Sequence, residues 1–232
     1  MSADGTGADA ALRPARRSDL AGLPVEVAPR LLGGHLAVTL GGETVVARLT
    51  EVEAYHGLGT GPVPDPGSHA RSGPTARNAT MWGEPGHLYV YLSHGIHSCV
   101  NVVCGPVGVA GGILLRGGEI VHGRDAARRR RLERGGVVRT DRDLARGPGR
   151  FGDAVGLRHP VHDGVDAITG AERHGASVLL SLPVAPLEGI EAGPRVGVAG
   201  VAGTGAFPWR FWIAGDATVS AFRWGRGAAV LD

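Results

Sequence analysis

Two adjacent glycines, Gly41 and Gly42, separate two runs of β-prone residues, and this pattern restricts the fold more than any other feature of the chain. The first run, HLAVTL, covers residues 35–40, and the second, ETVVARLTEVEAY, covers residues 43–55. Glycine adopts the positive φ angles of a two-residue β-turn without steric cost, so the pattern is typical of a tight hairpin. It predicts two antiparallel strands, the second of them long.

The far end of the second predicted strand carries two acids on one side. Residues two apart in an extended strand face the same way, so Glu51 and Glu53 share a face with Tyr55. The common interpretation of such a pair is a solvated sheet face, because glutamate is mostly exposed. The alternative is a carboxylate that is partly removed from water, has a raised pKa and acts as a general base. The spacing alone favours the first interpretation and leaves the second open.

The rest of the chain mixes helix and strand signals, and no linker divides it into two domains. Residues 56–87 are rich in Gly and Pro, and a connection of this length is commonly functional or mobile. Glycine stops predict helices at 24–32, 122–134 and 147–157. A second hairpin, 87–93 with 97–103, is predicted around His94 and Gly95, and further strands are predicted at 111–117, 177–184, 195–202 and 211–220. We therefore expect one domain of the mixed α/β (α+β) class.

The N-terminal residues and the hydropathy of the chain indicate the cellular compartment of the protein. Residues 1–17 show no periodicity, so we predict a disordered arm over 1–17 and a folded domain over 18–232. No stretch approaches the roughly 20 apolar residues of a membrane span, and the first residues lack the apolar segment of a secretion signal. Two cysteines, Cys99 and Cys104, are too few for a disulfide framework. We expect a cytoplasmic protein that does not bind a membrane.

Positive charge is concentrated between residues 122 and 150. This region has ten arginines and four acidic residues, a local net charge of +6, whereas the whole chain has +2. A solvated helix surface and a phosphate-binding surface both fit this charge. GPGR at 147–150 begins a predicted helix, where backbone N–H groups and Arg150 could bind a phosphate. The chain has no lysine, so all 24 basic side chains are arginines.

Histidines precede the second predicted hairpin and surround its turn: His56, His69, His87, His94 and His97. With Cys99 and Glu53 nearby they suggest a metal site, but they form neither an HExxH nor a CxxC pattern. We therefore predict polar loop histidines and no metal. Tyr89 and Tyr91 share one strand face, which alone is more typical of an aromatic core stripe than of a stacking platform.

Eight motifs occur in the order and spacing of the alkyladenine (3-methyladenine, methylpurine) DNA glycosylase family, which the chain resembles over residues 20–224. They are LLGGHL, TEVEAYHG, SHARSGPTARN, GHLYVYLSHGIHSCVNVV, GGILLRG, LARGPGRFGDAVGL, RVGVAGVAG and PWRFWIAG. Each motif is unspecific alone, whereas eight in series are hard to obtain by chance. The resemblance implies a curved, mainly antiparallel sheet with flanking helices and a protruding β-hairpin, and no metal or organic cofactor.

The activity that this resemblance implies is base excision repair by a monofunctional DNA glycosylase. Such an enzyme flips alkylated or deaminated purines out of duplex DNA and hydrolyses the N-glycosidic bond. It would leave an abasic site and act as a monomer at the bacterial nucleoid. Glycosylases that also cut the strand usually need an amine for a Schiff base, and this chain, which has no lysine, offers only its α-amino terminus on the predicted arm. We therefore expect water as the nucleophile and an uncut strand.

Family positions carry over to individual residues of this chain. Glu53 matches the general base that activates the attacking water, and Arg116 matches a residue near that water and the target phosphate. The walls of the base pocket match Tyr55, His69, Tyr91 and Asn101, and Asn101 matches a residue that screens purines with a 2-amino group. Contacts to the DNA backbone are expected from Arg77, Arg128 and Arg150.

The turn of the second hairpin departs from the family pattern. His94 stands where the family has a tyrosine that wedges into the minor groove. Because histidine is planar and can stack, we expect intercalation to persist, with Ile96 or His97 assisting. A second hypothesis is a noncatalytic damaged-DNA-binding module on the same fold, which would be favoured if this change accompanied a loss of chemistry. The retained site residues speak against it: Glu53, His69, Tyr91, Asn101 and Arg116. A metal-dependent hydrolase that uses the histidine-rich loop is a third.

Overall fold

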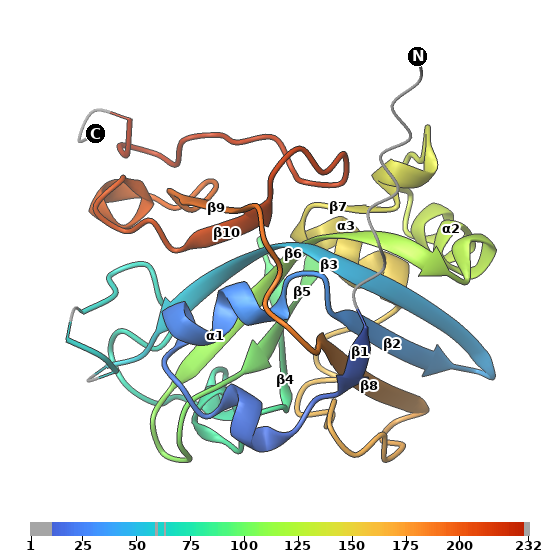
Figure 1. Ribbon diagram of the computed structural model, residues 1–232, viewed down its shortest axis with the longest axis horizontal. Helices are drawn as coiled ribbons and strands as arrows, with labels where there is room; N and C mark the ends of the chain where they lie inside the picture. The colour runs from blue at the N-terminus through green and yellow to red at the C-terminus, as the bar shows by residue number, and fades with distance from the viewer. Residues whose placement is uncertain (1–10, 59, 63, 230–232) are drawn as a thin grey trace.

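The computed structural model describes residues 11–58, 60–62 and 64–229, and a twisted antiparallel sheet runs through the middle of this part of the chain (Figure 1). Seven strands follow one another in the order β1-β8-β2-β3-β6-β5-β4, while β10 pairs with β3 and β9, and β7 pairs with β6. The strands are β1 Leu12–Pro14, β2 His35–Leu40, β3 Glu43–His56, β4 Leu88–Ser93, β5 His97–Val103, β6 Gly111–His122, β7 Ala145–Arg146, β8 Ala176–Pro183, β9 Ile190–Gly193 and β10 Arg210–Ile213.

The long strand β3 is the organising element of the sheet. It pairs along its first half with β2, as the Gly41-Gly42 turn predicts, and along most of its length with β6. Alternate side chains of β2, β3 and β8 point into one apolar core, among them Val38, Val45 and Val178. Each such fully buried side chain stabilises the fold by about 1.5–3 kcal/mol relative to an exposed one. The core therefore fixes the register of β3 and, with it, the face on which its acids lie.

Two irregularities interrupt the pairing of β3 with β6 beside the acids. The register passes from Leu49–Gly118 to Glu51–Gly117, and then to Val52–Leu115. Thr50 is therefore an extra residue on β3 and Arg116 an extra residue on β6. Bulges of this kind bend a strand and redirect a side chain. At this point Arg116 is placed beside the carboxylates of β3.

Three helices of the described residues flank the sheet: α1 Pro24–Leu31, α2 Arg124–Glu133 and α3 Pro148–Val155. Helix α1 packs on β3, whereas α3 packs on β5 and β6 and also contacts α2. The close approach of α3 to β5 requires glycine, because a Cβ at Gly152 would lie 2.1 Å from the carbonyl oxygen of Ser98. Short 3-10 turns occur at Arg17–Leu20, Ala79–Trp82, Asp141–Asp143 and Gly200–Gly203. The mixed α+β class expected from the sequence is confirmed.

Several boundaries differ from the sequence-based predictions. The predicted arm is wrong for residues 12–14, because these form β1 and pair with β8; residues 1–10 lie outside the described part. The predicted strand 195–202 is wrong, since these residues form a loop and a 3-10 turn rich in glycine. Strand 211–220 is confirmed only in its first residues, which belong to β10.

The helices are short and flank the sheet. Within the described residues, no helix combines the length and the apolar character that a bilayer crossing needs.

Candidate active site

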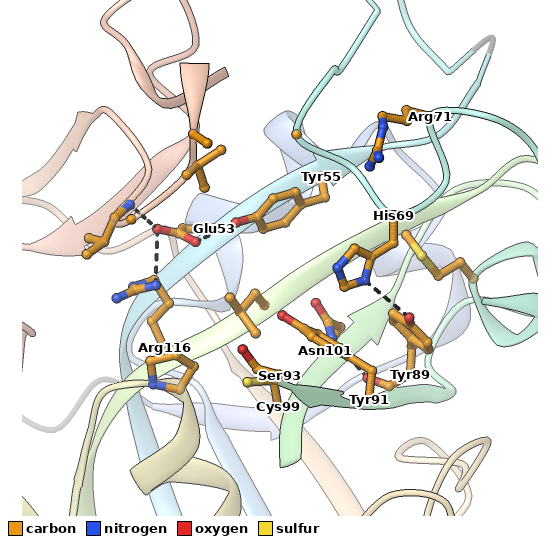
Figure 2. A pocket seen from close by; sticks show the side chains of 18 of the residues that line it. Glu53, Tyr55, His69, Arg71, Tyr89, Tyr91, Ser93, Cys99, Asn101 and Arg116 are labelled. Carbon is orange, nitrogen blue, oxygen red and sulfur yellow. Dashed lines mark hydrogen bonds and ion pairs between the residues drawn. The ribbon is translucent and has the colours of Figure 1, made fainter. Parts of the chain in front are cut away.

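A cavity of about 630 Å³ opens where β3, β4, β5 and β6 meet two loops, one before β4 and one before β10. All six residues predicted for catalysis and base binding line it: Glu53, Tyr55, His69, Tyr91, Asn101 and Arg116. Figure 2 shows Glu53, Tyr55 and Arg116 on one side of this cavity and His69, Tyr89 and Tyr91 on the other. The structure thus brings together residues that lie up to 63 positions apart in the chain.

Glu53 is fully buried, yet its carboxylate borders the cavity. The backbone N–H of Val196 donates to Oε1 at 2.7 Å, and the hydroxyl of Tyr55 donates to Oε2 at 2.8 Å. The Nη1 atom of Arg116 lies 3.3 Å from Oε1. Three partners from three separate segments therefore fix the orientation of one carboxylate. A buried charge requires such partners, because desolvation without them is costly.

Glu51 is also fully buried, so the interpretation of this pair as a solvated sheet face is wrong. Its Oε1 accepts hydrogen bonds from Nε of Arg116 at 3.0 Å and from Nε of Arg210 at 2.7 Å. Ser220 adds its backbone N–H, 2.7 Å from Oε2, and its hydroxyl, 2.9 Å from Oε1. The strand is buried on this side because the C-terminal part of the chain covers it. Glu51 anchors that cover and also fixes Arg116.

The pKa of Arg116 reflects the two buried carboxylates beside it. Burial lowers it, but the carboxylates of Glu53 and Glu51 outweigh burial, and the pKa lies above its ordinary value. Arg116 therefore stays cationic beside Glu53. A fixed positive charge at this place can stabilise a neighbouring carboxylate and attract a phosphate.

Tyr55 rests on a buried arginine that sequence reasoning missed. The guanidinium of Arg195 lies 4.5 Å from the centre of the Tyr55 ring, and Asp65 accepts two hydrogen bonds of 2.8 Å from it. The side chains of Arg195 and Asp65 are both fully buried. Burial, and after it the charge of Glu53, raise the pKa of Tyr55 well above its usual value. The phenol therefore stays protonated and can keep donating to Glu53.

The opposite wall of the cavity is aromatic. The rings of Tyr89 and Tyr91 stack with centroids 5.5 Å apart, and His69 meets Tyr91 edge-on at 4.5 Å. The ring nitrogen Nδ1 of His69 and the hydroxyl of Tyr89 share a hydrogen bond of 3.3 Å. Burial, followed by the charges of Arg71 and Arg77, lowers the pKa of His69. The imidazole is therefore neutral at pH 7, and the gap between this wall and Tyr55 suits a flat, apolar-faced ligand.

Asn101 lies at the base of the aromatic wall on β5. Its side-chain nitrogen donates to the carbonyl oxygen of Tyr89 at 3.0 Å, and it is almost fully buried. This bond fixes the amide, so that its orientation toward the cavity is set by the β4–β5 pair. A fixed amide can discriminate between ligand edges.

The predicted wedge residues occupy the exposed turn between β4 and β5. His94 lines the cavity edge and has a φ angle of 51°, and Gly95 follows it with φ of 70°. Ile96 is 60% exposed, and its carbonyl oxygen accepts a hydrogen bond from Arg134. His97 is exposed at the first residue of β5, close to Gly149 at the start of α3. All three side chains are available to a large partner.

The three arginines predicted for DNA backbone contacts lie on three different parts of the structure. Arg77 lines a smaller adjoining cavity together with His69 and Arg71. Arg150 lies in the first turn of α3 beside Asp143, at 3.8 Å. Arg128 lies on α2 and bonds Asp141 at 2.5 Å, so part of its charge is neutralised. Among the described residues, no group of His, Cys, Asp and Glu side chains is arranged to hold a metal ion.

Comparison with known proteins gives a consistent result. A family model described as "Methylpurine-DNA glycosylase (MPG)" matches residues 18–217. A protein of Leifsonia xyli subsp. xyli is 48% identical over 211 residues, which cover 91% of this chain and 93% of the relative. A protein of Streptomyces avermitilis is 45% identical over 210 residues, with coverage of 90% and 92%. Both relatives bear the name "Putative 3-methyladenine DNA glycosylase".

Proposed function

The chain belongs to the methylpurine-DNA glycosylase family and is a DNA glycosylase, and from this premise we propose how it acts. It flips an alkylated or deaminated purine out of duplex DNA, binds the base in the cavity between Tyr55 and the Tyr91 wall, and hydrolyses the N-glycosidic bond. The products are the free base and an abasic site. The enzyme acts as a monomer on chromosomal DNA.

The observation that carries this proposal is the fully buried Glu53 carboxylate at the edge of a cavity with aromatic walls. A base inside a duplex is unreachable, and its extrusion costs a few kcal/mol of stacking and pairing. Aromatic surfaces such as those of Tyr55 and Tyr91 recover part of that cost. Cleavage through an oxocarbenium-like sugar needs a carboxylate close to the anomeric carbon. Glu53 supplies this group, orients the water and accepts its proton.

Arg116 and His69 have supporting roles in this mechanism. The guanidinium of Arg116, 3.3 Å from the Glu53 carboxylate, holds that group in place and binds the phosphate of the extruded nucleotide. Neutral His69 can exchange a hydrogen bond with the base edge without adding a positive charge, which would repel cationic alkylated purines. Asn101, fixed through Tyr89, excludes purines that carry a 2-amino group by steric and polar mismatch.

Water is the nucleophile in this proposal because the chain has no lysine. A strand-cleaving glycosylase forms a Schiff base between an amine and the opened sugar. Borohydride added during turnover is therefore expected to trap no protein–DNA adduct, and the abasic strand is expected to remain uncut. A trapped adduct would require another nucleophile and would overturn this step.

The decisive experiment compares Glu53→Gln with wild type and with Glu172→Gln, which changes an exposed glutamate far along the chain. Release of 3-methyladenine, 7-methylguanine, hypoxanthine and 1,N6-ethenoadenine from duplex DNA is measured under single-turnover conditions. Loss of the Glu53 carboxylate, the proposed general base, should reduce the rate of purine release by roughly 10²–10⁴-fold, while the affinity for damaged DNA stays largely intact. The Glu172 variant should behave as wild type.

Two other outcomes would favour the alternatives. A wild-type protein that binds damaged DNA but releases none of the four bases would be a noncatalytic binding module. The observation in favour of this alternative is His94, which replaces the tyrosine expected at the wedge position. Release that disappears on chelation and returns with added metal would indicate a metal-dependent hydrolase. Full activity of Glu53→Gln would contradict the role of Glu53 itself.

A further inference from the structure

The C-terminal segment Phe222–Arg226, with the sequence FRWGR, follows the last residue that the family model matches, yet it is bound to the wall of the cavity. The backbone N–H of Gly197 donates to the carbonyl oxygen of Arg223 at 2.9 Å, and that of Gly200 donates to Arg226 at 3.0 Å. A Cβ at Gly225 would lie 1.9 Å from the carbonyl oxygen of Val198. The segment therefore packs directly against the loop 196–199 that lines the cavity.

The chain just before this segment is fixed as well. Ser220 is held by the buried carboxylate of Glu51 at 2.7 and 2.9 Å, and its carbonyl oxygen accepts a bond of 3.0 Å from Arg210. Figure 1 shows this last part of the chain, in red, at the edge of the molecule that also carries β9 and β10. The backbone of Phe222–Arg226 is thus held at both ends, by the anchor of the active site and by the cavity loop.

The side chains of the segment, in contrast, are partly or largely exposed to solvent. Phe222 is 38% exposed and Trp224 is 40% exposed, and their rings meet edge-on with centroids 4.8 Å apart. Arg223 and Arg226 are exposed, and neither guanidinium has a carboxylate or a hydrogen-bond acceptor among the described residues. The arginines on α2 and α3 differ, because Arg128 and Arg150 face Asp141 and Asp143.

We propose that Phe222–Arg226 binds the sugar–phosphate backbone of duplex DNA next to the cavity. Arg223 and Arg226 contact phosphates, and Trp224, supported by Phe222, packs on a sugar or an exposed base edge of the same strand. Unneutralised arginines beside exposed aromatic rings suit a polyanion with apolar faces. Because the backbone is already fixed, little ordering is needed on binding. The inference rests on the proposed function, since the flipped nucleotide brings its strand to this wall.

The test removes both charges in the variant Arg223→Gln/Arg226→Gln. Its control, Arg30→Gln/Arg173→Gln, removes two exposed charges from α1 and from the turn before β8. Affinity for an undamaged duplex and for a duplex with an abasic-site analogue is measured as a function of salt. Each phosphate contact that is removed lowers the slope of log K against log salt by about one, so a decrease of about two is expected, against no change for the control.

Trp224→Ala separates the aromatic contact from the charges. It should weaken binding by about fivefold to a hundredfold with an unchanged salt slope, because stacking and packing release no counterions. For all variants, single-turnover release of 3-methyladenine at saturating enzyme should equal that of wild type, since the cavity residues are intact. A salt slope equal to that of the control double variant would overturn the inference. A different result would overturn the proposed function alone: the wild-type salt slope exceeds that of Arg223→Gln/Arg226→Gln by about two, yet the wild-type protein releases no purine from damaged DNA.

Discussion

Glu53 and His94 border the same cavity, but the protein holds their side chains in different ways. Glu53 is fully buried, and three groups lie 2.7–3.3 Å from its carboxylate. His94 is exposed in the β4–β5 turn, where its ring nitrogen Nδ1 shares a hydrogen bond of 3.0 Å with the hydroxyl of the preceding Ser93. The Glu53 carboxylate is thus held by groups from three segments of the fold, whereas, within the described residues, the His94 side chain at the cavity edge is held only by its sequence neighbour.

This difference has a physical basis. A general base must keep its position to within a fraction of an ångström, so its support comes from several segments of the fold. A residue that enters a duplex must instead make few interactions in the free protein. Each interaction that is broken on entry costs free energy and so weakens DNA binding. Changes in the wall around Glu53 should therefore alter folding or chemistry, and changes at the turn should alter DNA affinity alone.

The largest expected effect on the fold comes from Asp65→Ala, which leaves Arg195 as an unpaired charge with no exposed side-chain surface. Breaking one partner of a buried ion pair destabilises a protein by about 3–5 kcal/mol. Asp65 also accepts hydrogen bonds from the backbone N–H groups of His56 and Gly67, which the substitution removes. The free energy of unfolding in urea should fall by this amount, and Tyr55 should lose its support.

Glu43→Ala is the matched control for that experiment. Glu43 pairs with Arg129 at the surface, and both side chains are 53% exposed. A solvated pair of this kind contributes about 0–1 kcal/mol. Equal losses of stability in the two variants would show that the Asp65–Arg195 pair does not support the cavity wall in the way that its burial indicates.

A smaller effect should appear when pH is lowered. His56 stacks on Trp209 with ring centroids 4.5 Å apart, and burial, only partly offset by the charge of Asp65, lowers the pKa of His56. Below the ordinary histidine pKa of about 6.5 the unfolded chain then binds more protons than the folded one. Stability should therefore fall as the pH drops from 7 to 5, with His56 contributing at most about 1.4 kcal/mol per pH unit.

The variant His56→Phe tests the assignment of this pH dependence. It keeps a ring against Trp209 but removes the titrating group, so the slope of unfolding free energy against pH should flatten. The control His122→Phe changes a histidine that is exposed at the end of β6. If both variants kept the wild-type slope, the acid sensitivity would arise from other groups, of which His69 and His162 also have lowered pKa values.

The sequence predicted those parts of the fold whose signals are local. The Gly41-Gly42 hairpin and the β4–β5 hairpin were recognisable because turn residues and β-prone runs lie side by side. The segment LRP at 12–14 carries no such signal, since its partner β8 lies some 170 positions further along the chain. Residues 195–202 resemble a strand by composition, but they form a glycine-containing loop and a 3-10 turn instead, and residues 196–199 of the loop line the cavity.

The site shows the same limit of local patterns. Alternation along β3 placed Glu51, Glu53 and Tyr55 on one face, which is correct, but it favoured exposure for the two acids. The covering groups, Arg210 and Ser220, come from the distant C-terminal part of the chain. Arg195 was contained in a recognised motif, yet nothing in its neighbourhood pointed to Asp65 or to the ring of Tyr55. Long-range ion pairs of this kind become visible only in the fold.

The smallest effect on the folded protein, and the sharpest test of the β4–β5 turn, is expected from His94→Ala. An exposed side chain away from the core changes stability by no more than about 0.5 kcal/mol, so the unfolding free energy should stay near that of wild type. If His94 fills the gap of a flipped nucleotide as proposed, affinity for abasic-site DNA should fall by about fivefold or more, because the substitution removes the planar ring. His94→Tyr should restore or exceed wild-type affinity, since a larger ring stacks over more area. Unchanged affinity in His94→Ala would show that the turn does not enter the duplex through this residue, and Ile96→Ala would then identify whether the neighbouring apolar side chain does.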